Sequence, residues 1–243
     1  MMEFTYRGYE RLLNKLISLD YEFSDYRSWE DKKRSVILRH DIDYDVTKAL
    51  RLAELEAGIN GVSSTYFVLL TSDLYNVFSK ETNEMLRSIA DMGHGIGLHF
   101  DEKRYEGIGL GRLADKIRQE AEILSDVLGT GIDTVSMHRP RKELLDAALA
   151  IPGMINSYSP VFFNEFKYVS DSRRRWREDI DAVTEAGYDR LHILTHAFWY
   201  NEEEIGIEDS VESFVNDANR CRYEKMSQNI TDIGAIMGRD KIR

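Results

Sequence analysis

Short apolar runs that alternate with helical stretches are the feature that most restricts the fold of this chain. We predict strands at residues 36–40, 63–70, 95–100, 134–138, 167–169 and 191–196. Apolar side chains at helical spacing predict helices at residues 82–92, 113–128 and 143–150, and residues 208–237 suggest one or two mostly polar helices. Strands that alternate with helices form parallel sheets whose faces the helices cover. The sequence therefore predicts an α/β fold.

The length and charge of the chain exclude several functional classes. Its 243 residues suit a single domain, residues 1–243, with a sizeable core. The 43 acidic side chains outnumber the 32 basic ones, which argues against nucleic acid or an anionic membrane as the main partner. The one cysteine excludes an intrachain disulfide and a thiolate zinc cluster. With no signal-peptide core and no long apolar stretch, we expect a cytoplasmic protein without membrane insertion.

Side chains suited to catalysis or metal binding follow nearly every predicted strand, where the functional groups of βα folds gather. They are Asp41 and Asp43, residues 71–73, His99 and Asp101, His138 and Arg139, residues 170–172, and Thr195 and His196. Asp41 and Asp43 share one side of an extended strand, where their charges repel unless a cation or a shared proton intervenes. Acids that cap the next helix would explain an isolated pair. The recurrence of His and Asp favours a metal or acid–base site.

Five motifs occur in an order that is typical of one enzyme family. They are RHDID at residues 39–43, GHGIGLH at 93–99, Arg139-Pro140, Asp171 with Trp176, and LTH at 194–196. Through them, residues 36–200 resemble the polysaccharide deacetylase (NodB-homology) family of metal-dependent carbohydrate esterases. The resemblance implies a distorted (β/α) barrel of about seven strands. It also implies a hydrolase that deacetylates a sugar or nucleotide sugar. Within this family, the segments HDID, GLHFD, HRP and SDS are most similar to those of deacetylase-like proteins from bacterial surface-polysaccharide (lipopolysaccharide) gene clusters.

The resemblance implies a divalent metal ion, which we expect to be zinc. Such a site needs three protein ligands and an open position for water. Asp43 and His99 are the first two. The family's second motif normally supplies another histidine four positions after the first, but Lys103 stands there and cannot ligate while protonated. The third ligand is therefore His138, which we favour, or Asp101, which shares the strand parity of His99.

The resemblance also implies roles for four further residues. Asp41 would accept a proton from water, and Arg139 would keep Asp41 ionised and oriented. His196 would donate a proton to the leaving amine, with Asp171 fixing the tautomer of its ring. The implied partner is an acetylated sugar or nucleotide sugar, and the sequence leaves the oligomeric state open.

The other three histidines are predicted to be structural. His94 has the opposite strand parity to His99, and His40 points away from the side of the strand that carries Asp41 and Asp43. His192 lies four residues before His196, further from the carboxyl end of the predicted strand. We expect none of the three to act in the site.

Other functional classes account for fewer of these residues. A haloacid-dehalogenase-type phosphatase needs Thr or Val four positions after its first Asp, where Asp45 stands. A calcium loop starting at Asp41 would need glycine and glutamate at the positions of Val46 and Leu52. The remaining alternative is a non-catalytic sugar-binding or scaffold protein with the deacetylase fold, because Lys103 interrupts the second motif.

Overall fold

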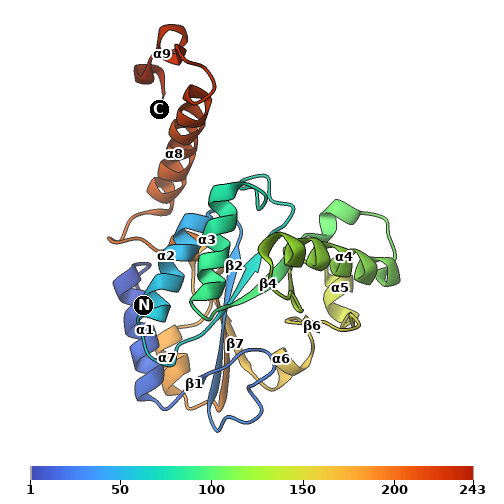
Figure 1. The fold of residues 1–243 in the computed structure, drawn as a ribbon. Helices are drawn as coiled ribbons and strands as arrows, with labels where there is room; N and C mark the ends of the chain where they lie inside the picture. The colour runs from blue at the N-terminus through green and yellow to red at the C-terminus, as the bar shows by residue number, and fades with distance from the viewer. Residues whose placement is uncertain (1, 243) are drawn as a thin grey trace. The chain divides into compact units, whose positions relative to one another are not determined.

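A computed structural model describes residues 2–242 of the chain. Strands and helices alternate along the chain, as predicted for an α/β fold (Figure 1). The chain divides into two compact units, Met1–Glu202 and Glu203–Arg243, and the first contains every strand of the described residues. This division reflects local packing, and the single-domain assignment stays a prediction.

The first unit is built on a parallel sheet. Its strands are β1 (Glu22–Phe23), β2 (Ser35–Ile42), β3 (Thr65–Val68), β4 (Gly95–Phe100), β5 (Thr134–Met137), β6 (Ile155–Asn156), β7 (Lys167–Ser170) and β8 (Arg190–Thr195). The order is β6-β5-β4-β3-β2-β8-β7, with β1 paired to β2 off this path. The two ends of the path, β6 and β7, are consecutive in the chain, which is the order of a barrel opened between them. The predicted distorted (β/α) barrel of about seven strands is confirmed.

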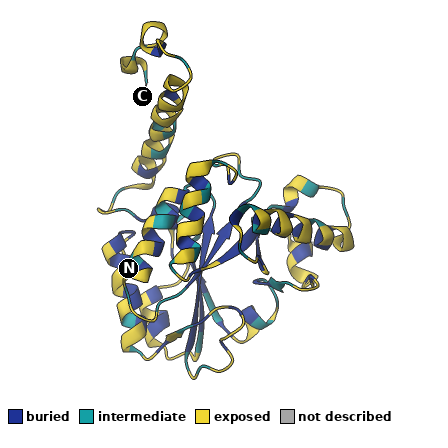
Figure 2. Cartoon of the chain, in the orientation of Figure 1, coloured by how far each residue is buried: buried dark blue, intermediate teal, exposed yellow. Residues whose placement is uncertain are grey.

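Helices pack against both faces of the sheet in the first unit. Their bounds are α1 (Tyr6–Ser18), α2 (Val46–Ala57), α3 (Lys80–Asp91), α4 (Leu110–Leu128), α5 (Lys142–Asp146), α6 (Val161–Asn164) and α7 (Ile180–Glu185). Contacts between neighbours give the series α7-α1-α2-α3-α4. Side chains cap several of these helices, as Asp45 does when it accepts a hydrogen bond from the Thr47 backbone N–H at 2.8 Å. The strands are mostly buried, while the long helices expose one side (Figure 2).

Strand β2 is buried along its whole length, and its side chains alternate between the two faces of the sheet. On one face, Ile37 joins a buried cluster with Tyr26, Trp29, Phe67, Phe162 and Phe166. The same parity carries Arg39, Asp41 and Asp43 along that face toward the carboxyl end of the strand. On the other face, His40 contacts helices α1 and α2. The chemistry of the strand therefore lies on the face opposite these helices.

A buried carboxylate organises the face that carries His40. Glu56 is fully buried and accepts hydrogen bonds from Tyr9 at 2.6 Å, His40 at 2.8 Å, Ser64 at 2.6 Å and Tyr66 at 2.8 Å. Burial alone would raise the pKa of Glu56, but His40 and the other partners lower it to about 2. His40 is thus a structural residue, as predicted.

The other two histidines predicted to be structural also have contacts inside the fold. His94 Nε2 lies 3.1 Å from the Ala53 carbonyl oxygen, and His192 Nε2 lies 2.9 Å from the Tyr26 hydroxyl. Burial is the main cause that lowers the pKa of both rings, which favours their neutral form. Both rings are buried and bonded within the fold, which is what we expect of structural residues.

The second unit consists of the predicted polar helices. They are α8 (Ile207–Ser227) and α9 (Ile233–Ile236), followed by the short helix η4 (Arg239–Lys241). Tyr223 donates a hydrogen bond to the Met237 carbonyl at 2.9 Å and so links α8 to the residue after α9. Among residues 2–242, no helix combines the length and the apolar character needed to cross a membrane.

Candidate metal centre and active site

Three side chains from three strands converge at the carboxyl edge of the sheet. Asp43 follows β2, His99 belongs to β4, and His138 follows β5. His99 Nε2 lies 3.1 Å from Asp43 Oδ1, and His138 Nδ1 lies 3.2 Å from the same oxygen. The two ring nitrogens are 3.0 Å apart. This is the ligand set that the sequence favoured, and all three potential ligand atoms lie within 4.8 Å of one another.

The chemistry of this cluster fits a divalent metal ion. Asp43 Oδ1 is buried and has no hydrogen-bond partner, although two imidazole nitrogens lie close to it. His99 Nδ1 lies 2.5 Å from the Ser136 hydroxyl, a contact that leaves Nε2 facing the cluster. Burial alone would raise the pKa of Asp43, but the His138 and His99 rings hold it well below its usual range. One carboxylate and two imidazoles are a ligand set found in catalytic zinc sites.

Asp101 and Lys103 do not belong to this cluster. Strand β4 ends at Phe100, and Asp101 instead caps the short helix η1 (Glu102–Tyr105) by accepting a hydrogen bond from the Lys103 backbone N–H at 3.1 Å. The Lys103 side chain is exposed. Of the two candidates for the third ligand, the geometry therefore favours His138.

Asp41 is held by an arginine of its own strand. Arg39, which is fully buried, donates from Nε to Asp41 Oδ1 at 2.9 Å and from Nη2 to Oδ2 at 2.8 Å. Burial alone would raise the pKa of Asp41, but Arg39 lowers it below its usual value. Asp41 Oδ2 also lies 3.7 Å from His99 Nε2, so the carboxylate borders the cluster. Asp41 is therefore an ionised, oriented base candidate.

The expectation that Arg139 steadies Asp41 is corrected by these contacts. The Arg139 side chain is 64% exposed, and its Nη2 lies 3.8 Å from Asp101 Oδ2. Its backbone φ is +49°, a left-handed conformation at the turn after β5 that directs the chain away from the strand. Arg39 makes the contact instead because it has the same parity as Asp41 on β2.

His196 and Asp171 form a buried pair beside the cluster. Asp171 Oδ1 lies 2.6 Å from His196 Nδ1, and Asp171 Oδ2 accepts a hydrogen bond from the His196 backbone N–H at 3.1 Å. This fixes the ring so that Nε2 lies 3.9 Å from Asp43 Oδ2. Burial alone would lower the pKa of His196, but Asp171 and the other carboxylates raise it to about 9. The surrounding carboxylates therefore favour the protonated form of the ring, the form that can donate a proton.

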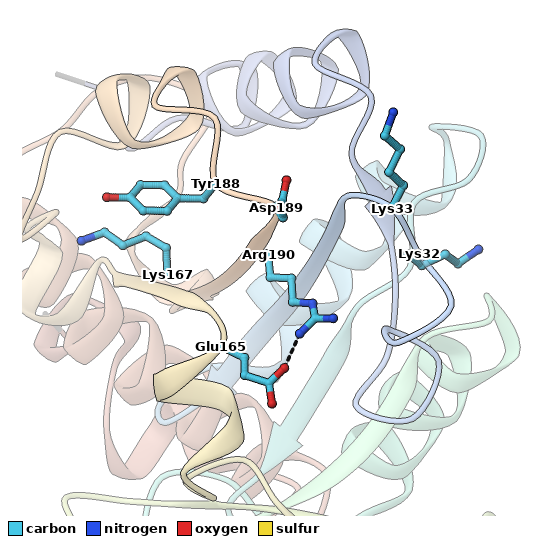
Figure 3. A pocket seen from close by; sticks show the side chains of 7 residues that line it. All are labelled: Lys32, Lys33, Glu165, Lys167, Tyr188, Asp189 and Arg190. Carbon is cyan, nitrogen blue, oxygen red and sulfur yellow. Dashed lines mark hydrogen bonds and ion pairs between the residues drawn. The ribbon is translucent and has the colours of Figure 1, made fainter.

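A polar cavity lies elsewhere in the first unit. It has a volume of about 360 Å³ and is lined by Lys32, Lys33, Glu165, Lys167, Tyr188, Asp189 and Arg190 (Figure 3). Lys167 and Arg190 begin β7 and β8, so this cavity is at the amino end of the strands, opposite the cluster. Arg190 pairs with Glu165, and Lys167 pairs with Glu178 at 2.7 Å. Lys167 and Arg190, two of the cations in the lining, are thus each paired with a carboxylate of the protein.

Comparisons with known proteins find similarity at the level of structure. No model of a protein family and no curated protein matches the chain. One match is the crystal structure of a mutant of BA3943, a CE4 family pseudoenzyme from Bacillus anthracis, with restored enzymatic activity. This chain is 14% identical to that mutant, with a TM-score of 0.45. That match covers 78% of this chain and 64% of the BA3943 chain, so this chain spans less than two thirds of it.

Two deacetylases also match. The peptidoglycan deacetylase PdaC from Bacillus subtilis is 16% identical with a TM-score of 0.45, and the match covers 82% of this chain and 96% of PdaC. The Bc1960 peptidoglycan N-acetylglucosamine deacetylase is 18% identical with a TM-score of 0.42, and the match covers 84% and 88% of the two chains. In its ordered motifs the chain resembles the polysaccharide deacetylases of the NodB-homology type.

Proposed function

We propose that this chain is a metal-dependent hydrolase that removes an acetyl group from the amide nitrogen of a sugar or nucleotide sugar, a precursor of a bacterial surface polysaccharide. One observation carries the proposal. Two buried pairs, Arg39 with Asp41 and Asp171 with His196, border the cluster of Asp43, His99 and His138. A pure binding protein needs neither an oriented base nor an oriented acid.

In the proposed reaction, Asp43, His99 and His138 would hold the divalent metal, with zinc as our choice. A metal held there would supply Lewis acidity toward the attacking water and the acetyl carbonyl. Asp41 accepts the proton of the attacking water as the new C–O bond forms, while Arg39 keeps its carboxylate in place. His196 gives a proton to the nitrogen as the C–N bond breaks, and Asp171 holds the ring. The products are acetate and the free amine of the sugar.

Acetate release from a panel of N- and O-acetylated sugars and nucleotide sugars tests this proposal. The purified chain is assayed as prepared, after chelation, and after zinc is added back. We expect release from at least one N-acetylated compound, loss of release on chelation, and recovery with zinc. Saturable sugar binding without turnover across the panel would contradict the proposal and favour a non-catalytic sugar-binding protein.

A further inference from the structure

The segment that brings His138 to the cluster is attached to the residues that follow β4. The His138 backbone N–H donates to the Phe100 carbonyl at 2.8 Å. The next residue, Arg139, has a φ of +49°, a conformation that non-glycine residues adopt only when their surroundings hold it. Because His138 and His99 come from different segments, their spacing depends on how firmly these segments are joined.

Glu102 makes the second attachment. Its side chain is only 1% exposed, and one carboxylate oxygen accepts a hydrogen bond from the Arg141 backbone N–H. The other oxygen accepts from Arg141 Nε at 3.1 Å. Glutamate is almost never fully buried unless it is paired, and here one of its two bonds is to the backbone of the loop. The carboxylate therefore fixes the path of the chain just beyond His138, whatever the half-exposed Arg141 side chain does.

We propose that Glu102 is a positioning residue for His138. It lies three residues after His99 and accepts a hydrogen bond from Arg141, three residues after His138, so it joins the two segments that carry these histidines. With the Phe100 contact, it confines the segment at both ends, and His138 Nδ1 is held 3.0 Å from His99 Nε2. This inference rests on the proposed function, because it assumes that the cluster binds a divalent metal.

Zinc affinity, measured by competition with a chromophoric chelator, tests the role of Glu102 without any substrate. In Glu102→Leu both acceptor oxygens are lost at similar side-chain volume, so neither the backbone N–H nor Nε of Arg141 keeps its bond to residue 102. We expect zinc affinity to fall about 10–100-fold, the scale for losing the outer supports of a metal ligand. Glu106→Leu, at an exposed acid in the same segment, is the matched control and should bind zinc like the wild type.

A double-mutant cycle separates positioning from a general loss of structure. If Glu102 acts through His138, then Glu102→Leu should change zinc affinity less than about two-fold in a His138→Ala background. The same loss in both backgrounds, or wild-type affinity in the single variant, would overturn the inference while leaving the proposed function intact. A wild-type chain that binds no zinc would overturn both. If Glu102→Leu does not fold, Glu102→Asp tests the same point, because its shorter side chain withdraws from Arg141; wild-type affinity there would also overturn the inference.

Discussion

Replacing Asp41 by asparagine or His196 by alanine is expected to lower kcat for acetate release by about 10²–10⁴-fold, the usual scale for losing general acid–base help. An asparagine at position 41 would keep the shape of the side chain but could not take a proton from water. An alanine at position 196 would leave the amine nitrogen without its proton donor. Release of acetate from the best substrate of the panel measures both effects, and zinc content measured in parallel shows that the metal site is intact.

Asp91→Asn is the matched control for Asp41→Asn, since Asp91 is an exposed acid at the end of α3. It should turn over like the wild type. Unchanged turnover in both Asp41→Asn and His196→Ala would rule out the proposed acid and base, whatever the substrate.

Removal of Arg39 is expected to destabilise the protein by about 3–5 kcal/mol, because Arg39→Leu leaves the buried Asp41 carboxylate without its partner. Arg139→Leu should cost less than about 1 kcal/mol, since the Arg139 side chain is largely exposed and lies 3.8 Å from Asp101. Urea unfolding followed by circular dichroism measures both changes in the free energy of unfolding.

The double variant Arg39→Leu with Asp41→Leu provides the internal check. Removing both partners takes away the uncompensated charge, so this variant should recover part of the stability lost in Arg39→Leu. Equal destabilisation by Arg39→Leu and Arg139→Leu would show that the structure assigns the wrong arginine to Asp41.

Much of the site could be predicted from the positions of residues relative to strands. β4 has the predicted bounds, and the predicted ligands Asp43, His99 and His138 meet at the carboxyl edge of the sheet. This follows because parallel strands bring their carboxyl ends to one edge. The same parity rule places Arg39 beside Asp41 on β2, so this contact could have been predicted from the sequence. The family motif instead assigns the role to Arg139.

Other features depended on local geometry that the pattern does not contain. Asp101 has the parity of His99, but β4 ends before it, and it caps a short helix instead. The helix predicted at residues 143–150 ends at Asp146, and Ala148 has a φ of +45°. The two-residue strand Ile155–Asn156 and the helix Val161–Asn164 are too short to show a hydrophobic period.

The burial of Glu56 could also have been predicted from the sequence. Ala49, Leu52, Ala53 and Glu56 are spaced as one face of α2, and all four are buried. A glutamate at the end of an apolar helix stripe predicts a buried partner, which is His40.

Zinc content, measured by elemental analysis on the wild type and on single variants of the cluster, tests the central claim most directly. We predict about one zinc ion per chain in the wild type and in the control Asp101→Asn, and strong loss in Asp43→Ala, His99→Ala and His138→Ala. Undiminished metal content in both Asp43→Ala and His99→Ala would contradict the metal site and the function built on it.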